Sequence, residues 1–237
     1  MRHPDTRMKL SIIIPALNEA GTIAPCLRAL QGLRSRGHEL IVVDGGSGDG
    51  TPQLAGQLAD TVIHSARGRG AQMNRGAAAA YGEVLVFLHA DTLLPPDADS
   101  ILAQHLPGGP AWGRFEVRLS GERFVFRIIE FLMNLRSRLT GIATGDQAMF
   151  VTRDLFRQSG GFADLELMED IEFSARLKRR APPLCLRDRV LTSSRRWEER
   201  GVMRTILGMW WLRLRYALGA NPAHLSREYY GRVNPRR

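Results

Sequence analysis

Four short apolar runs, separated by segments of helical periodicity and by polar turns, occupy the first 90 residues of this 237-residue chain. The runs are Leu10–Ile14, Glu39–Asp44, Thr61–His64 and Val84–Leu88. Strands that alternate with helices in this way form a mostly parallel sheet with helices on both faces, and such sheets bind nucleotides at the carboxyl ends of their strands. We therefore expect an α/β domain whose functional residues lie where these strands end.

The other predicted elements complete a single mixed α/β domain. Helical spacing indicates a helix over Glu19–Arg36, and alternation over Trp112–Leu119 is typical of an antiparallel strand. We expect another strand over Gln147–Thr152, and helices over Arg123–Leu139 and Met168–Arg180. The Arg123–Leu139 helix carries an apolar stripe of Phe124, Ile128, Phe131, Leu132, Leu135 and Leu139.

Positive charge is concentrated at the C-terminal end of the chain. The net charge is +9, and residues 187–237 contain 12 arginines, no lysine and four acids. Residues 1–186 are nearly neutral, with 21 basic and 20 acidic side chains. We predict a catalytic domain over residues 1–197 and a basic helical extension over residues 198–237. The extension suggests a polyanionic partner such as a membrane surface, a nucleic acid or an anionic substrate.

Composition excludes several classes of protein. The chain is 44% hydrophobic and 24% charged, as in a folded globular protein. Cys26 and Cys185 are too few for a disulfide framework or a cysteine zinc site, so the default expectation is a reducing cytoplasm. The run Leu10–Leu17 is short and contains a proline, unlike a secretion signal. Three arginines interrupt the apolar segment 201–220, which argues against a membrane-spanning helix.

Polar residues follow each predicted strand at the point where a ligand would bind. The first strand leads into Pro15–Glu19, the second ends at Asp44 before a glycine-rich turn, and the fourth leads into His89–Asp91. Arg67 and Arg69 follow the third strand just before a predicted helix, where cationic side chains suit a phosphate or a base edge. Taken singly, an aspartate before a glycine-rich turn is usually a turn residue, and an arginine in such a loop is often simply solvated. Their order and spacing together favour a nucleotide site.

These segments resemble the signatures of family 2 glycosyltransferases with the A-type fold, over about residues 9–197. Pro15–Glu19 resembles the opening motif of the family, and residues 44–51 resemble its Asp-x-x-Ser-x-Asp-Gly-Thr motif. His89–Asp91 falls on the metal-binding Asp-x-Asp motif, and Glu169-Asp170 falls on the catalytic-base motif. Within the family the chain is most similar to a small bacterial subgroup of transferases associated with selenium- or arsenosugar gene neighbourhoods.

The resemblance implies an inverting, metal-dependent transfer from a nucleoside-diphosphate sugar, most simply a uridine nucleotide, with Asp170 as the base. It assigns Asp91 to a Mn²⁺ or Mg²⁺ ion. His89 replaces the first carboxylate of the motif, so it either ligates the metal or hydrogen-bonds the sugar. The implied donor contacts are Pro15, Asn18, Glu19, Asp44, Ser47, Arg67, Ala90, Asp91 and Arg196. The implied acceptor contacts are Asp146, Glu169 and Trp197.

The segment 201–218 is predicted to be an amphipathic helix with two possible roles. Its apolar side holds Leu207, Trp210, Trp211, Leu214 and Leu218. Such a stripe is packed core or a dimer contact in one interpretation. In the other it is an interfacial helix that rests on anionic lipid, which would make the protein peripheral on the inner face of a membrane and bring a lipid-linked acceptor to the site.

Other function classes fit less well. A sugar nucleotidyltransferase predicts a basic glycine-rich loop after the first strand, and a dinucleotide-dependent oxidoreductase predicts Gly-x-Gly-x-x-Gly there, whereas this chain has Pro15–Glu19. The remaining alternative is a non-catalytic basic module that binds membrane or nucleic acid and keeps a transferase-like body. No nucleic-acid-binding motif is recognisable, so we expect no specific nucleic acid partner.

Overall fold

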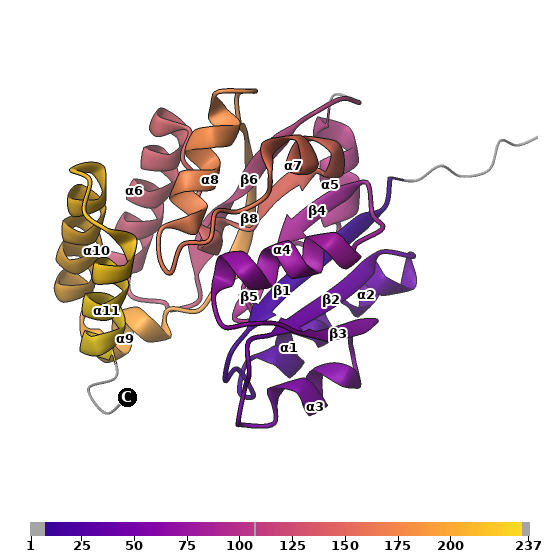
Figure 1. The fold of residues 1–237 in the computed structure, drawn as a ribbon, viewed down its shortest axis with the longest axis horizontal. Coiled ribbons are helices and arrows are strands. Elements are labelled where there is room, and N and C mark those ends of the chain that lie inside the picture. The colour runs from indigo at the N-terminus through magenta and orange to yellow at the C-terminus, as the bar shows by residue number, and fades with distance from the viewer. Residues whose placement is uncertain (1–7, 107, 234–237) are drawn as a thin grey trace, which may run out of the picture.

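The computed structural model describes residues 8–106 and 108–233, and their strands form one eight-stranded mixed sheet (Figure 1). The order is β3-β2-β1-β4-β7-β6-β8-β5. Strands β1 to β4 are parallel, β7 is antiparallel to both of its neighbours, and β8 runs parallel to β6 and antiparallel to β5. The strands are β1 Leu10–Ala16, β2 Glu39–Asp44, β3 Thr61–His64, β4 Val84–Phe87, β5 Thr92–Leu93, β6 Trp112–Leu119, β7 Met149–Thr152 and β8 Leu184–Thr192. The predicted α/β class is confirmed.

Helices cover both faces of this sheet because successive strand residues point to opposite sides. In β1, Ile12 and Ile14 pack in the cluster under α1, α2, α3 and α5, whereas Ile13 packs in the cluster under α4, α7 and α8. These helices are α1 Ile23–Ala29, α2 Gln31–Ser35, α3 Thr51–Gly56, α4 Arg69–Ala79, α5 Ala98–His105, α7 Arg153–Ser159 and α8 Glu169–Lys178. Buried apolar side chains on both faces of β1, β2 and β4 explain the continuous apolar runs in the sequence.

Two sequence predictions need correction. The single helix predicted over Glu19–Arg36 begins only at Ile23 and is broken at Leu30 into α1 and α2. Its first residues are held as a turn, because the backbone N–H groups of Glu19 and Ala20 donate to side chains of the loop after β2. Strand Trp112–Leu119 has the predicted bounds but is antiparallel only to β7, since β8 lies parallel on its other edge.

A helical layer lies on the side of the molecule where β6 and β8 are found, away from β3 (Figure 1). It contains α6 Phe124–Thr140, α9 Arg195–Arg200, α10 Val202–Ala217 and α11 Pro222–Val233. The predicted boundary between residues 197 and 198 falls inside α9, and Trp197 is buried with residues of α6 and α10. Within residues 8–106 and 108–233, no helix combines the length and apolarity that crossing a membrane requires.

Candidate active site

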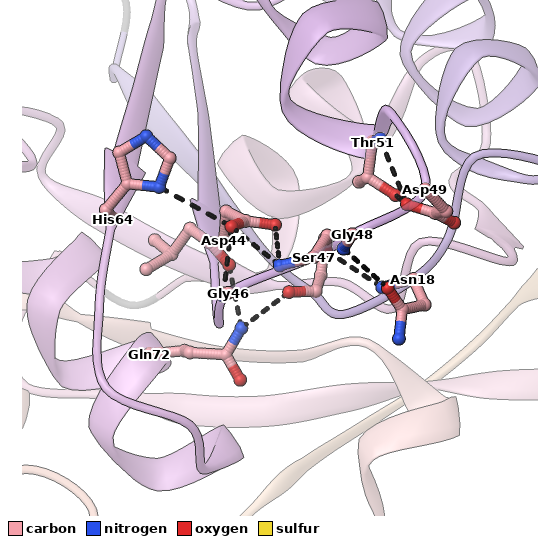
Figure 2. A network of polar contacts seen from close by, with 11 residues as sticks. Asn18, Asp44, Gly46, Ser47, Gly48, Asp49, Thr51, His64 and Gln72 are labelled. Carbon is pink, nitrogen blue, oxygen red and sulfur yellow. Dashed lines mark hydrogen bonds and ion pairs between the residues drawn. The ribbon is translucent and has the colours of Figure 1, made fainter.

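The loops after β1 and β2 are joined by hydrogen bonds between backbone and side chains (Figure 2). The Asn18 N–H donates to Ser47 Oγ at 2.8 Å, and the Gly48 N–H donates to Asn18 Oδ1 at 3.0 Å. Glu19 N–H donates to Thr51 Oγ1 at 2.8 Å. Asn18 has a positive φ of 55°, a conformation that asparagine tolerates better than most residues. The Pro15–Glu19 and 44–51 motifs therefore fold as one unit.

Asp44 ends β2 and is almost fully buried, with 1% of its surface exposed. Its carboxylate accepts hydrogen bonds from the Gly46 N–H at 3.0 Å and the Ser47 N–H at 3.1 Å, and His64 Nδ1 lies 3.5 Å away (Figure 2). Burial would raise the pKa of Asp44, but the hydrogen bonds from Ser47, Gly46 and His64 outweigh it and lower that pKa below its ordinary value. Asp44 is thus held as an anion that orders the loop.

Gln72 of α4 holds the ends of β1 and β2 together. Its Nε2 donates to the carbonyl oxygens of Ala16 and Val43, both at 2.8 Å, and the side chain is 3% exposed. Sequence reasoning missed Gln72, because a lone glutamine in a helix carries no signal of what it faces. His64 was likewise not among the predicted site residues, although its position at the end of a predicted strand was a usable signal.

A polar cavity of about 160 Å³ opens beside these loops. It is lined by Pro15, Glu19, Arg69, His89, Ala90, Asp91, Arg195 and Glu199. Three of these side chains are carboxylates and two are guanidinium groups. The charges of two of the carboxylates, Asp91 and Glu19, act on the buried thiol of Cys26. Burial first, and then the charges of Asp91 and Glu19, raise the pKa of Cys26 to about 12. The charges of Asp91 and Glu19 thus act on the thiol in the same direction as burial does.

A second space, the mixed cavity, adjoins the polar cavity and has a volume of about 130 Å³. Arg69, His89 and Asp91 line both. The polar part of the mixed cavity also includes Asp146, Glu169 and Asp170, and its apolar part is formed by Leu119, Leu167, Trp197, Met209 and Leu212. It can accept a molecule that carries both hydroxyl groups and an apolar portion.

The backbone of Gly145 separates His89 from Asp170. The Gly145 N–H donates to Asp170 Oδ2 at 2.9 Å, and the Ile171 N–H donates to Asp170 Oδ1 at 2.7 Å. A Cβ atom on Gly145 would overlap Nε2 of the His89 ring. This position needs glycine because the imidazole occupies the space that a side chain would take.

Glu169 is the most deeply buried acidic residue of the mixed cavity. Glu169 is 5% exposed, and burial together with the neighbouring charge of Asp170 raises its pKa to about 7, although Arg69 opposes the shift. Asp146 Oδ1 is buried and has no hydrogen-bond partner within the described part of the chain. Burial, and then the charge of Arg213, lowers the pKa of nearby Arg136 to about 10.

The structure brings together most, but not all, of the predicted site residues. Its two cavities contain Pro15, Glu19, His89, Ala90, Asp91, Asp146, Glu169, Asp170 and Trp197. Asn18, Asp44 and Ser47 line neither cavity and build the adjacent loop. Arg67 is exposed on the loop before α4, outside both cavities. Arg196 belongs to α9, but its side chain lies outside the described residues.

Several cavity residues were not among the predicted set. Arg69 lines both cavities in place of Arg67, and Arg195 and Glu199 line the polar cavity. Met209, Leu212 and Arg213 of α10 and Tyr229 of α11 line the mixed cavity. No sequence signal marks the α10 and α11 residues, because they come from a segment without a motif.

Residues 11–160 match the sequence signature of glycosyl transferase family 2. The chain belongs to this family. An uncharacterised family relative, a glycosyltransferase of Mycobacterium tuberculosis (strain ATCC 25618 / H37Rv), is 33% identical over 190 residues, which cover 75% of this chain and 72% of the relative. A PGL/p-HBAD biosynthesis glycosyltransferase of Mycobacterium bovis (strain BCG / Pasteur 1173P2) is 34% identical over 127 residues, 48% of this chain and 49% of that protein. This chain thus matches about half the length of the M. bovis protein.

Solved structures with the same fold include glycosyltransferases. The TM-score is 0.64 against Staphylococcus aureus TarS residues 1–349, at 20% identity over 79% of this chain and 61% of that one. A second structure is glucosyl-3-phosphoglycerate synthase of Mycobacterium tuberculosis in complex with Mn²⁺, UDP and glucosyl-3-phosphoglycerate, with a TM-score of 0.60. The identity is 22%, and the match covers 84% of this chain and 76% of that one. These likenesses establish the fold. The family signature ends at residue 160, so roles for Glu169 and Asp170 rest on geometry.

Proposed function

We propose that this chain transfers a sugar, with inversion, from a nucleoside-diphosphate sugar to an acceptor hydroxyl group. One observation carries the proposal: His89 and Asp91, which follow β4, line the same cavity as Asp170 at the start of α8. A leaving diphosphate and an attacking hydroxyl need opposite sides of one sugar, and we assign them to the His89–Asp91 and Asp170 ends of this cavity. We also propose that the chain belongs to the subgroup associated with selenium- or arsenosugar genes. The name of that subgroup refers to neighbouring genes and does not identify a substrate.

The nucleoside end of the donor is assigned to the joined loops after β1 and β2. Asp44 is held as an anion and keeps acceptor capacity for a base N–H or a ribose hydroxyl. Glu19 and Pro15 lead from this loop into the polar cavity. Solved relatives of the fold include complexes with UDP and with GDP-mannose. We infer a uridine nucleotide, and the experiment below compares it with other bases.

The diphosphate is assigned to the polar cavity together with Mn²⁺ or Mg²⁺. The polar cavity sets Glu19, Asp91 and Glu199 against only two guanidinium groups, so a bound cation would favour a diphosphate there. The Asp91 carboxylate and the His89 imidazole fit such an ion, with His89 seated in the space that Gly145 leaves. No group of three such ligands occurs among the described residues, so phosphate oxygens would complete the coordination. When bound, the ion neutralises the charge of the leaving diphosphate.

Asp170 is assigned as the base that takes the proton of the acceptor hydroxyl. Its two oxygens accept hydrogen bonds from the N–H groups of Gly145 and Ile171, and each keeps capacity for a further hydrogen bond at the cavity that Asp170 lines. The buried Asp146 Oδ1 lacks a hydrogen-bond partner within residues 8–106 and 108–233, and an acceptor hydroxyl would satisfy it. Glu169, with a pKa near 7, is suited to donate a hydrogen bond to the sugar.

A thermal-shift screen of UDP-, GDP- and dTDP-sugars with Mn²⁺ tests the proposal. A UDP-sugar at 100 times its Kd should stabilise the folded state by about 2.7 kcal/mol, because it binds only that state. For a chain of this size each kcal/mol raises Tm by roughly 2–4 °C. Chelation of the metal with EDTA should remove the shift. If no sugar nucleotide raises Tm with or without metal, donor binding is refuted.

Substitution of Gly145 by alanine is expected to weaken Mn²⁺-dependent UDP binding by roughly tenfold, the scale seen when groups that orient metal ligands are lost. The added Cβ would overlap the His89 ring, which must then rotate away. Calorimetric titration of UDP with Mn²⁺ measures the effect. Gly56→Ala is the matched control, because a Cβ there meets no atom within 4 Å. Equal affinities of the Gly145 variant and the control would remove His89 from the site.

A further inference from the structure

Helices α6 and α10 each expose a complete apolar stripe. The two stripes have the same spacing along the chain, and their side chains are 38–78% exposed. We call them together the docking surface: Phe124, Ile128, Phe131, Leu132, Leu135 and Leu139 on α6, and Met203, Leu207, Trp210, Trp211, Leu214 and Leu218 on or just after α10. The stripe predicted on each helix from its periodicity is therefore the side that faces away from the protein.

The docking surface is not what attaches these helices to the protein. On α6, Phe126 and Ile129 are buried in a cluster that also receives Ile206 and Met209 of α10. At 100° per residue these anchoring residues lie on other sides of their helices than the exposed stripes. The two helices thus pack on one common cluster and leave their second apolar sides uncovered at the end of the molecule farthest from β3 (Figure 1). Large apolar side chains gathered on an exposed side of a soluble protein mark an interaction surface.

Charge distinguishes between the occupants that could cover this surface. Helices α6 and α10 carry six arginines, of which Arg127, Arg138 and Arg215 are paired with Glu130, Glu116 and Glu228. Arg136 has buried guanidinium nitrogens, and Arg213 lines the mixed cavity. The excess positive charge near the docking surface therefore comes from the wider segment 187–237, which holds 12 arginines and four acids. A second copy docked through the same patch would bring two basic surfaces together. An anionic lipid surface would instead attract them, and apolar side chains flanked by arginines and tryptophans are typical of helices that lie in a membrane interface.

We propose that the docking surface inserts into the interface of an anionic phospholipid membrane, with α6 and α10 lying in its plane. The opposite side of α10 supplies Met209, Leu212 and Arg213 to the mixed cavity, so docking sets that cavity beside the lipid headgroups. An acceptor carried on a lipid would then reach Asp170 without leaving the membrane. This consequence for the acceptor rests on the proposed function, whereas the membrane contact itself does not.

Co-sedimentation of the full chain with vesicles tests the proposal. The protein should bind phosphatidylcholine vesicles that contain about 30 mol% phosphatidylglycerol, and should bind pure phosphatidylcholine more weakly. Raising the salt from about 0.05 to about 0.5 M should weaken binding, because screening removes the charge attraction and leaves the apolar insertion. The triple variant Phe131→Ser, Leu207→Ser, Trp210→Ser should lower the partition coefficient by roughly tenfold or more.

Tyr81→Ser is the matched control, because Tyr81 is 52% exposed, as Trp211 is, but lies outside the docking surface. The control should bind vesicles like the unmodified protein. Absence of binding to anionic vesicles at low salt overturns the proposal, and so does equal binding by the triple variant. Sedimentation of a dimer that the triple variant loses, without vesicle binding, would assign the surface to a second copy instead. The thermal shift caused by a UDP-sugar with Mn²⁺ is measured on the same protein samples. If the shift is present but vesicle binding is absent, the membrane proposal fails and the proposed function does not.

Fluorescence of the unmodified protein provides a measurement that does not depend on the folding of a variant. Trp112 and Trp197 are buried, whereas Trp210 and Trp211 are 66% and 52% exposed. Vesicles that contain brominated lipid should quench the emission of the exposed pair and shift the remaining spectrum. An unchanged spectrum in the presence of anionic brominated vesicles would contradict insertion.

Discussion

Substitution of Asp170 by asparagine is expected to lower the rate of sugar transfer by a factor of about 10²–10⁴, the range that general acid–base catalysis contributes. Asparagine keeps the shape of the side chain and one oxygen for the Gly145 N–H, but it cannot accept the proton of the acceptor hydroxyl. Donor affinity should remain within about twofold, because proton transfer is a transition-state interaction. The initial rate of nucleoside diphosphate release and a calorimetric Kd for UDP with Mn²⁺ measure the two quantities.

Asp164→Asn is the control for this substitution, since Asp164 is an exposed aspartate in the loop that leads to α8 and lines neither cavity. It should leave both the rate and the affinity unchanged. Near-normal release by the Asp170 variant, with donor still bound, would show that Asp170 is not the base. A parallel loss of donor affinity would instead point to a structural role at the Gly145 turn.

Substitution of Asp91 by alanine is expected to weaken Mn²⁺-dependent UDP binding by at least about 10–100-fold, because that is already the cost of losing a group that merely orients a metal ligand. The substitution removes a carboxylate that both cavities share, and with it much of the attraction for a divalent cation. Titration of UDP into the protein, in the presence of Mn²⁺ and again with EDTA, separates the metal-dependent part of the affinity. The two proteins should differ only when metal is present.

Asp97→Ala is the matched control, because Asp97 is an exposed aspartate close in sequence whose side chain makes no capping hydrogen bond to α5. It should bind UDP like the unmodified protein in both conditions. Retention of the full Mn²⁺-dependent affinity by the Asp91 variant would remove Asp91 from the metal site. Such a result would leave the proposed general base at Asp170 untouched, because the two substitutions test different ends of the cavity.

Hydrophobic patterning predicted the sheet well where neighbours in sequence are also neighbours in space. The bounds of β2, β3 and β6 agree with the predicted segments. Strand β8 was not predicted, because exposed charged residues such as Arg187 and Arg189 interrupt its pattern near the edge of the sheet. The helix over Glu19–Arg36 was drawn too long, because contacts with Asp49 and Thr51 from the next loop override the local preference of its first residues.

Motifs predicted much of the candidate site and missed the parts that come from distant segments. Asp91 and Asp170 were expected at one site, and the structure places both at the mixed cavity. Arg67 and Arg69 were both candidates for a phosphate or a base edge, but only Arg67 was assigned as a donor contact, whereas Arg69 lines both cavities and Arg67 lines neither. The contribution of α10 had no local signal, because Met209 and Leu212 read as ordinary apolar helix residues.

The sequence alone determined the α/β class, the strand ends that carry polar residues, and the family, because strand periodicity and motif spacing are properties of short segments. Only the tertiary structure decided that Gly145 accommodates His89 and orients Asp170, and that α10 closes the site. It also decided that the apolar stripes of α6 and α10 face outward. Periodicity reveals that a helix has an apolar side, but which side is buried depends on the packing of segments far apart in the chain.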